Sequence, residues 1–368
     1  MVLGTTEMGG AQMFLLNLLR QIDRDRFQVD MAVNREVKAS GIADEWRSLG
    51  CHIYILPYFK VYNYFSFVRL WRKFLSEHSY DIVHGHASNS ASVYLRLAKE
   101  AGCTTIAHSH SAGYRGRWME RLVKRLFARG VGRVADYWFA CSDKAAERLF
   151  GKGYRLYSHY YDIPNAIDAE QYRYTVDVPG RIRRELGVKD GELLCGHIGS
   201  FSQPKNHSFL LDIFAEVLKL RSDARLVCCG AGPLMPQVKE KASELGLLDK
   251  IFFAGVVKNA NDYLMAMDVF VFPSLFEGFP IAVIEAEATG LPVVMSDVIT
   301  READMTDLIH RHALSDSASA WAKTICNITP ENRPAYNQKI VESKYNMRTS
   351  VQLISTLYEE MAQSRNGY

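Results

Sequence analysis

The stretch DVFVFPSLFEGFPIAVIEAEATGLPVVMS, residues 268–296, limits the possible folds of this chain more than any other segment. An apolar run at Val269–Phe272 predicts a buried strand, Ile281–Ala288 predicts a helix, and Leu291–Met295 predicts the next buried strand. Two strands joined through a helix predict a βαβ unit in which the strands are parallel. The segment therefore indicates an α/β protein built on a parallel sheet.

Two glutamates occupy informative positions in this unit. Glu277 lies in the turn after the first strand, and Glu285 lies two helical turns further on. Pro280 stands where a first helical residue belongs, since no N–H is needed there, and Gly290 is placed to cap the helix. Helix N-termini attract phosphate, and carboxylates accept hydrogen bonds from sugar hydroxyls. The unit fits a nucleotide-sugar site at the carboxyl ends of the strands, although this spacing also occurs by chance on solvated helices.

Strand and helix signals alternate along the whole chain. The predicted strands of the first half are Met1–Gly4, Phe27–Val33, His52–Leu56, Asp81–Gly85, Thr105–His108 and Tyr137–Cys141. Those of the second half are Leu193–Ile198, Ala224–Cys229, Ile251–Phe253, Val269–Phe272 and Pro292–Met295. This alternation predicts two doubly wound, Rossmann-like domains that face each other across a cleft.

The boundary between the two domains is expected in a polar segment. Asp168–Arg184 contains Pro179 and Gly180, which favour a linker rather than a regular element. The predicted parts are an N-terminal acceptor-binding domain at residues 1–175, a donor-binding domain at residues 176–345, and a C-terminal helical segment at residues 346–368.

Composition narrows the class of protein. The chain has 368 residues, a formal net charge of +3, 48% hydrophobic and 23% charged residues, which is typical of a soluble protein and gives no indication of a nucleic-acid partner. The seven cysteines are scattered and odd in number, which favours buried thiols in a reducing compartment over disulfides or a zinc site. No apolar run approaches the ~20 residues that span a bilayer. We expect a cytoplasmic protein that can still touch a membrane.

Further motifs occur in a fixed order along the chain: GGAQ near the start, HSH at His108–His110, PNAID at Pro164–Asp168, PKNH at Pro204–His207 and GAGP at Gly230–Pro233. Together with EGFP, the second glutamate and GLPVV, they resemble the retaining family 4 glycosyltransferases of the GT-B fold over nearly the whole chain. The run SDVITREAD resembles the branch that builds bacterial capsular and exopolysaccharides. The resemblance implies a last helix, Ser350–Gln363, that crosses back to the first domain.

The resemblance also implies a role for each matching residue. His110 would reach the donor sugar near the reacting centre, Lys205 would contact the donor diphosphate, and Glu277 would hold the sugar hydroxyls; these three are the catalytic candidates. Glu285 would hold the ribose diol. The implied donor-binding residues are Gly9, Gly10, Gly199, Ser200, Lys205, Val256, Gly278, Phe279, Pro280, Ile281 and Glu285.

Two departures and one false motif bear on the mechanism. Ser200 stands where the family often has arginine, so a bidentate phosphate contact is missing. Asp23-Arg24-Asp25 spells the D-x-D of metal-dependent transferases but lies in a charged turn after a helix, so we assign it to chance and expect no metal and no cofactor besides the donor. The first strand is also short. These departures motivate the alternative of an inactive GT-B partner of another transferase.

Basic residues interleaved with aromatic ones suggest how the protein reaches its acceptor. Arg115–Arg133 predicts a basic amphipathic helix, and Tyr64–Phe74 has a similar composition. Such helices bind anionic membrane surfaces, or else turn their apolar stripe to the core. The expected activity is transfer of a hexose from a nucleotide diphosphate sugar, UDP-linked rather than GDP-linked, to a lipid-linked or glycan acceptor in cell-surface polysaccharide or glycolipid synthesis. Epimerisation of a nucleotide sugar on the same fold is a further alternative.

Overall fold

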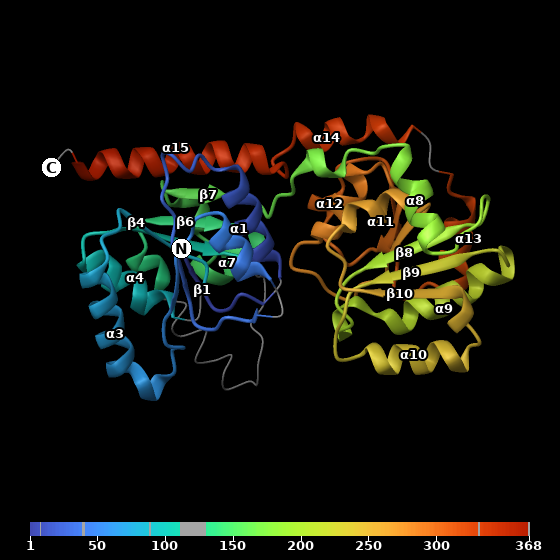
Figure 1. The fold of residues 1–368 in the computed structure, drawn as a ribbon, viewed down its shortest axis with the longest axis horizontal. Helices are drawn as coiled ribbons and strands as arrows, with labels where there is room; N and C mark the ends of the chain where they lie inside the picture. The colour runs from blue at the N-terminus through green and yellow to red at the C-terminus, as the bar shows by residue number, and fades with distance from the viewer. Residues whose placement is uncertain (8, 39–40, 88–89, 111–129, 330–331, 367–368) are drawn as a thin grey trace. The chain divides into compact units, whose positions relative to one another are not determined.

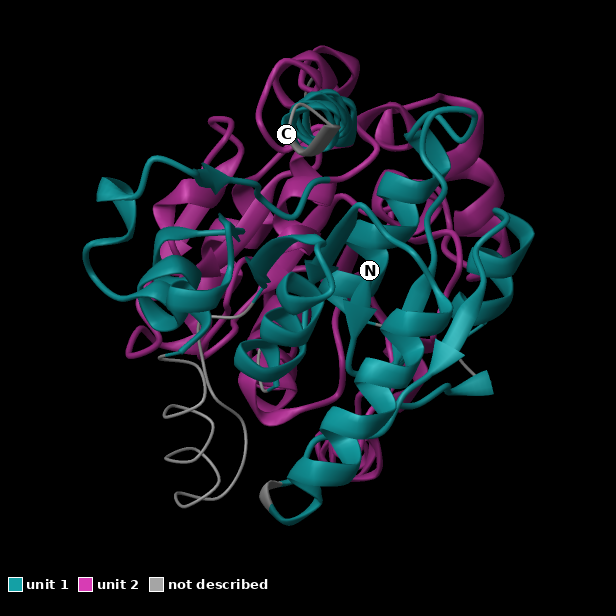
Figure 2. Cartoon of the chain, turned by 90° about the vertical axis from the view of Figure 1, so that its left-hand side faces the viewer, with its two compact units in different colours: residues 1–166, 347–368 teal, residues 167–346 magenta. Residues whose placement is uncertain are grey.

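The computed structural model describes residues 1–7, 9–38, 41–87, 90–110, 130–329 and 332–366. The chain forms two compact units, coloured separately in Figure 2. Unit 1 consists of Met1–Ala166 and Met347–Tyr368, and unit 2 consists of Ile167–Asn346. Each unit contains one parallel β-sheet.

Unit 1 is a seven-stranded parallel sheet with the order β3-β2-β1-β4-β5-β6-β7. Its strands are β1 Val2–Leu3, β2 Met31–Val33, β3 Ile53–Ile55, β4 Ile82–Gly85, β5 Thr104–Ser109, β6 Tyr137–Ala140 and β7 Tyr160–Asp162. Its described helices are α1 Gly10–Gln21, α2 Ile42–Ser48, α3 Tyr64–Glu77, α4 Ala91–Glu100, α6 Val131–Val134, α7 Asp143–Phe150 and α15 Met347–Asn366.

Unit 2 is a six-stranded parallel sheet with the order β10-β9-β8-β11-β12-β13. Figure 1 labels its strands β8, β9 and β10. Its strands are β8 Leu194–Ile198, β9 Arg225–Cys229, β10 Ile251–Gly255, β11 Val269–Phe272, β12 Val293–Ser296 and β13 Ile309–His312. Its described helices are α8 Asp177–Glu185, α9 His207–Leu220, α10 Met235–Glu244, α11 Ala260–Ala266, α12 Ile281–Ala288, α13 Ala318–Asn327 and α14 Asn337–Val341.

Both sheets change winding direction beside their first strand. In unit 1, β1 pairs with both β2 and β4, and in unit 2, β8 pairs with both β9 and β11. Ligands of open α/β sheets bind outside the carboxyl ends of the strands at such a switch point. The two doubly wound α/β domains predicted from the sequence are confirmed, and each one offers a position for ligand binding.

Helices cover both faces of each sheet, which explains the continuous apolar strands. In unit 1, the core on one face includes Leu18 of α1 and Trp46 of α2, and the core on the other face includes Trp71 of α3 and Tyr94 of α4. In unit 2, α8, α11, α12 and α14 contribute to one core, while α9, α10 and α13 contribute to the other. Each sheet is therefore the buried middle layer of its unit.

The C-terminal helix belongs to unit 1, as expected. The apolar face of α15 carries Ile354, Leu357 and Met361, which are buried in the same core as Phe14 of α1. In Figure 1 α15 is the long red helix. Burial of these side chains contributes about 1.5–3 kcal/mol each, enough to hold the helix on unit 1.

The predicted linker is wrong in part, because Asp168–Arg184 overlaps helix α8. Pro179 is the third residue of α8, where its missing N–H costs no hydrogen bond, and Ile182 anchors the helix in the core. The second unit also begins at Ile167 rather than at 176, since the N–H of Ile167 donates to the carbonyl of Tyr345 at 2.9 Å. Strand β13 was not predicted.

The two basic segments have different outcomes. Most of Arg115–Arg133 lies outside the described residues. On α3 the aromatic residues Phe67, Trp71 and Phe74 are buried, so this stripe faces the core, but Phe65 is 86% exposed. Among the described residues, no helix combines the length and the apolar character needed to cross a bilayer.

Candidate donor and transfer sites

Lys205 and Glu277 form an ion pair at the carboxyl end of the sheet in unit 2. Lys205 ends a short 3-10 helix, Gln203–Lys205, that follows β8, and Glu277 lies between β11 and α12. The Lys205 Nζ lies 2.7 Å from Glu277 Oε1, with the two side chains 17% and 13% exposed. Nζ also lies 4.7 Å from the centre of the Phe272 ring. A largely desolvated cation and carboxylate therefore meet at the switch point of the sheet.

Two glycines allow this arrangement. A Cβ on Gly199 would lie 3.1 Å from Lys205 Cδ and 2.9 Å from His197 Nε2, so no side chain fits without displacing the lysine. Gly230 has φ +137°, and its Cβ would lie 2.0 Å from the carbonyl oxygen of Gly199. Ser200 is exposed and its hydroxyl lies 2.9 Å from that of Ser202. The turn after β8 therefore supplies one cation, Lys205, and a neutral side chain at position 200.

Helix α12 begins beside this ion pair. Pro280 occupies the N-cap position rather than the first helical position, because its φ and ψ are −88° and 74°. The N–H of Ile281 donates to the carbonyl of Phe279 at 3.1 Å, so it is engaged rather than free for a ligand. Within the described part of the chain, the N–H groups of Gly278 and Phe279 have no acceptor. These two groups are among the donors that the helix start offers.

Glu285 is held by a residue that the sequence did not single out. The hydroxyl of Tyr172 donates to Glu285 Oε1 at 2.8 Å. Burial raises the pKa of Glu285, while the Tyr172 hydrogen bond and the charge of Lys205 act in the opposite direction. Tyr172 lies in the segment expected to be a linker, so no signal pointed to it. Val256, after β10, is 63% exposed at the same end of the sheet.

His110 lies at the carboxyl end of β5 in unit 1. Its Nδ1 lies 2.8 Å from Asn165 Oδ1, and its Nε2 lies 2.7 Å from His86 Nδ1. Gly10 begins α1, and a Cβ there would lie 3.7 Å from the Asn165 amide nitrogen. Gly9 caps α1 in extended conformation. The predicted residues His110 and Gly10 therefore lie close to Asn165 and His86, which were not predicted. Asn165 lies in the PNAID motif, and His86 directly follows the predicted strand Asp81–Gly85.

The imidazole of His110 is neutral at physiological pH. Burial lowers its pKa to about 4, the hydrogen bond with Asn165 raises it, and the charge of Arg148 lowers it further. The ring also packs against Phe14, with ring centres 5.5 Å apart. A neutral and fixed imidazole can donate or accept hydrogen bonds but adds no charge to this end of the sheet.

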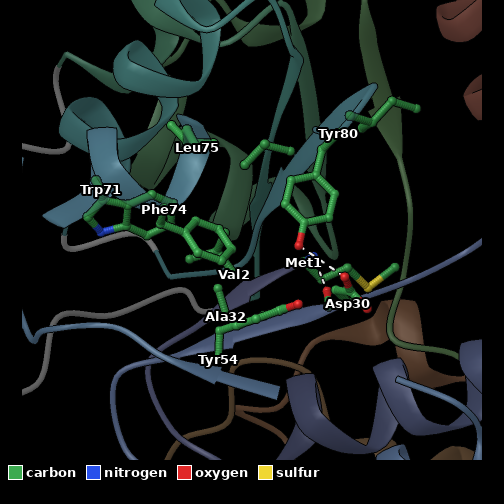
Figure 3. Close-up of a pocket in the computed structure, with 11 residues that line it drawn as sticks. Met1, Val2, Asp30, Ala32, Tyr54, Trp71, Phe74, Leu75 and Tyr80 are labelled. Carbon is green, nitrogen blue, oxygen red and sulfur yellow. Dashed lines mark hydrogen bonds between the residues drawn. The ribbon is translucent and has the colours of Figure 1, made fainter. Parts of the chain in front are cut away.

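Figure 3 shows residues that line a cavity in unit 1, and none of the lining residues is one of the site residues above. The volume of the cavity is about 20 Å³, room for about one water molecule. Asp30 lines it, receiving hydrogen bonds from the Tyr80 hydroxyl at 3.0 Å and from the amino group of Met1 at 2.6 Å. A nucleotide sugar needs hundreds of cubic ångströms, so this cavity is not a donor site.

Comparison with known proteins agrees with the fold. Residues 8–171 match the family model for Glycosyltransferase Family 4, and residues 192–329 match the model for Glycosyl transferases group 1. The chain is 31% identical to EpsF of Bacillus subtilis (strain 168), a protein named as a glycosyltransferase, over 90% of this chain and 88% of that protein.

Two further relatives have more specific names. The capsular polysaccharide biosynthesis glycosyltransferase CapH of Staphylococcus aureus is 24% identical, covering 79% of this chain and 78% of CapH. An Escherichia coli protein named UDP-Gal:alpha-D-GlcNAc-diphosphoundecaprenol alpha-1,3-galactosyltransferase is 26% identical, covering 61% of this chain and 60% of that protein.

The fold is similar to that of solved structures. The crystal structure of Anabaena Alr3699/HepE in complex with UDP and glucose superposes with a TM-score of 0.77 at 17% identity, covering 97% of this chain and 99% of that chain. At this identity the superposition supports the fold alone. The long match to EpsF, the two family models and the two parallel α/β domains show that this chain belongs to the family 4 glycosyltransferases of the GT-B fold, with a relative named for capsular polysaccharide synthesis.

Proposed function

We propose that the protein is a retaining, metal-independent hexosyltransferase that uses a UDP-sugar. The observation that carries this proposal is the Lys205–Glu277 pair at the switch point of the sheet in unit 2, with Glu285 held by Tyr172 in the same unit. The Escherichia coli relative, which is named for a UDP-Gal donor, supports the nucleotide.

In the proposed reaction, the bond between the anomeric carbon and the diphosphate oxygen breaks and UDP leaves. Lys205 and the N–H groups of Gly278 and Phe279 stabilise the negative charge that grows on the diphosphate, which is preorganised electrostatic catalysis. The acceptor hydroxyl attacks from the face that UDP leaves, and a donor phosphate oxygen takes its proton. Glu277 accepts hydrogen bonds from the sugar hydroxyls. No metal ion and no protein nucleophile takes part in this scheme.

The proposed acceptor is a lipid-linked glycan at an anionic membrane. The name of the Escherichia coli relative includes a diphosphoundecaprenol acceptor. On this chain, Tyr62 is 82% exposed and Phe65 is 86% exposed at the start of α3, and Arg69 and Lys73 are exposed further along the helix. Exposed aromatic side chains beside cations suit the interface of an anionic bilayer. Tyr62, Phe65, Arg69 and Lys73 together form the surface that we propose contacts the membrane.

Thermal unfolding with nucleotides tests the donor. We expect UDP and one UDP-hexose to raise the Tm in EDTA, since a ligand at 100 times its Kd adds about 2.7 kcal/mol to the stability of the native state. Lys205→Ala should lose most of this shift. Lys219→Ala is the matched control, because Lys219 also forms an ion pair in unit 2 but is 69% exposed on α9. No shift with any nucleotide would favour the inactive partner instead.

The stereochemistry is tested on the product. With the UDP-hexose found above and a lipid-diphosphate glycan, the product should keep the anomeric configuration of the donor, as NMR of the new linkage reports. Inversion would reject the retaining mechanism but not the transferase. Loss of activity in EDTA with recovery on added Mg²⁺ would reject metal independence. Release of an epimerised nucleotide sugar without acceptor would point to the epimerase.

Vesicle sedimentation tests the membrane contact. We expect binding to vesicles with anionic lipid at low salt and weaker binding at high salt, because salt screens the attraction. Replacing Tyr62 and Phe65 by alanine should weaken binding, while Leu156→Ala should not, although Leu156 is 92% exposed in the same unit. Binding that is unchanged by the first pair of substitutions would place the contact elsewhere on the protein.

A further inference from the structure

Four histidines form a compact group at the carboxyl ends of β4 and β5. His84 lies in β4 and His86 directly follows it, and His108 lies in β5 and His110 directly follows it. The rings stack in two columns, with ring centres 4.2 Å apart for His84 and His86 and 4.0 Å apart for His108 and His110. Hydrogen bonds join the columns, which gives an inner pair, His84 and His108, and an outer pair, His86 and His110.

The hydrogen bonds of the inner pair fix where its protons lie. His108 Nε2 lies 3.4 Å from the carbonyl oxygen of Ile163, which can only accept, so Nε2 carries the proton. His108 Nδ1 then accepts from His84 Nε2–H at 3.2 Å, and His84 Nδ1 accepts from the hydroxyl of Tyr358 at 2.6 Å. Both inner histidines are therefore neutral Nε2–H tautomers, and the chain of bonds ends on helix α15.

The outer pair has the opposite tautomer. Asn165 Oδ1 accepts from His110 Nδ1–H at 2.8 Å, so His110 Nε2 is an acceptor. His86 Nδ1–H donates to it at 2.7 Å, which leaves His86 Nε2 without a proton. That nitrogen is buried and has no partner among the described residues. The outer pair therefore consists of two neutral Nδ1–H tautomers.

A metal ion is the main competing explanation for such a group. Ligand nitrogens of His84, His86 and His108 lie within 4.8 Å of one another. However, the hydrogen bonds above occupy both nitrogens of His84 and His108, leaving only Nε2 of His86 available in this trio. Neighbouring rings in each column also face one another, and an imidazole coordinates through its edge rather than its face. The geometry favours a hydrogen-bonded group over a metal site.

We propose that His86 is a positioning residue for the transfer reaction: Asn165 sets the Nδ1–H tautomer of His110, and the bond from His86 Nδ1–H to His110 Nε2 fixes the orientation of that neutral ring. This inference rests on the proposed function and on the expectation, from the family resemblance, that His110 reaches the reacting sugar. The anomeric carbon gains positive charge as the diphosphate leaves, and a protonated imidazole nearby would oppose that charge. A neutral imidazole held at both nitrogens cannot turn or take up a proton without breaking a bond.

The tautomers can be observed without any assay of activity. Protonated and unprotonated imidazole nitrogens have well-separated 15N chemical shifts, so 15N-histidine labelling of the full chain reports the state of each ring. We expect Nδ1–H for His86 and His110 and Nε2–H for His84 and His108. Single substitutions of each histidine assign the 15N signals to the individual rings. An Nε2–H signal for His110, or a metal ion that copurifies in equimolar amount, would overturn the proposal.

Kinetics then separate positioning from folding. His86→Leu removes the donor and should lower kcat by roughly 10- to 100-fold, the usual loss when the partner of a functional histidine is removed, with a donor KM close to that of the wild type. His86→Asn keeps an N–H near the place of Nδ1 and should recover much of the rate. Tyr358→Phe is the matched control, because it breaks a buried bond of the inner chain and leaves His86–His110 intact.

The possible outcomes distinguish a failure of the proposal for His86 from a failure of the proposed transferase function. A kcat that falls equally in His86→Leu and Tyr358→Phe, in proportion to the Tm that each loses, would show a structural role and overturn the proposal. So would His86→Asn with the same kcat as His86→Leu. A wild-type protein that transfers no hexose from any UDP-sugar would instead reject the proposed function, and the tautomers measured by NMR would still stand.

Discussion

The candidate sites of the two units are built in opposite ways. In unit 2, the charged groups come from two short segments, Gly199–Lys205 and Glu277–Glu285, that each follow one strand. In unit 1, the neutral histidines are held by groups from β4, β5, the loop at Ile163–Asn165 and α15. The first kind of site can be found from a motif. The second kind depends on register and packing, so its partners become visible only in the folded chain.

The two sites also differ in charge, since unit 2 has charged side chains and unit 1 has neutral ones. Unit 2 keeps a cation and an anion, Lys205 and Glu277, which pair with each other and are 17% and 13% exposed. Unit 1 buries its imidazoles, and burial lowers the pKa of all four histidines of the group. We therefore propose that one unit stabilises charge and that the other positions neutral groups. The predictions below test this division, beginning with the largest effect.

Unit 2 depends on one buried arginine, and its removal should be the most damaging change. Arg333 donates hydrogen bonds to the carbonyls of Thr289, Leu264, Met265 and Met267. Burial lowers its pKa to about 10. Arg333→Ala would leave these buried carbonyls unpaired, and we expect a loss of about 3–5 kcal/mol in the free energy of unfolding, similar to breaking a buried ion pair.

Urea unfolding with hydrogen exchange localises that loss. Exchange should rise in β11 and β12 of unit 2 and change little in β4 and β5 of unit 1. Arg173→Ala is the control, because Arg173 pairs with Glu170 on the surface and should cost less than about 1 kcal/mol. If hydrogen exchange rose equally in both units of the Arg333 variant, the two units would unfold together. That result would contradict the separate treatment of the two units.

Lys205→Ala should lower kcat by about 100- to 1000-fold, the usual result of removing one preorganised electrostatic donor. The loss of the cation also leaves Glu277, 13% exposed, without its counter-charge. Steady-state transfer assays with the identified UDP-hexose measure the effect, with Lys219→Ala as the control. If Lys205→Ala raised only the donor KM, the lysine would bind the ground state and the transition state equally.

Acid and alkali should destabilise the protein through different groups. Burial raises the pKa of Glu287 to about 8, so its stabilising contribution is present below about pH 4.5 and is lost as pH rises towards 8. Burial lowers the pKa of His110 to about 4, so its contribution is present above about pH 6.5 and is lost as pH falls towards 4. The acid side involves histidines of both units, since the pKa of His207 is also lowered to about 4.

Glu287→Gln separates the loss of stability at alkaline pH from the loss at acid pH. Glutamine keeps an oxygen that can accept from the N–H of Met305 and from the N–H and hydroxyl of Thr306, as Glu287 Oε1 does. We expect the decline in stability between pH 5 and pH 9, on the order of a few kcal/mol, to flatten in this variant while the acid side is unchanged. Urea unfolding across pH measures both. An unchanged alkaline decline would assign it to another group.

Tyr172→Phe should have the smallest effect. It removes one hydrogen bond to Glu285, worth about 0.5–1.5 kcal/mol, so the donor KM should rise up to about 10-fold with kcat nearly constant. Tyr174→Phe, at a neighbouring tyrosine that packs against Arg333, serves as the control. A lower kcat at constant KM would place Glu285 at the reacting centre rather than at the ribose.

Much of the fold could be predicted from the sequence because its signals are local. The strand at Val269–Phe272 and the helix at Ile281–Ala288 have the bounds that the sequence predicted. Gly290 adopts φ +66° after that helix. Buried apolar runs, helix ends and glycine turns depend on neighbours within a few residues, so they can be recognised without the partner elements.

Local signals also explain the errors. Pro179 and Gly180 favoured a linker, but packing of Ile182 and the first-turn position of the proline made this segment part of α8. Strand β13 has only partly buried residues and two histidines, so it lacks an apolar run. In both places the contacts of the folded unit outweighed the local preference.

The sequence by itself determined the fold class, the family and the positions of Lys205, Glu277, Glu285 and His110, because these residues lie within recognisable motifs. Only the tertiary structure decided which residues hold them. Tyr172, which is 113 residues from Glu285 in the chain, donates a hydrogen bond to it, and His86 and Asn165 are hydrogen-bonded to His110. Hydrogen bonds need atoms within about 3 Å in a fixed direction. That condition depends on strand register and helix packing, which no local pattern of residues contains.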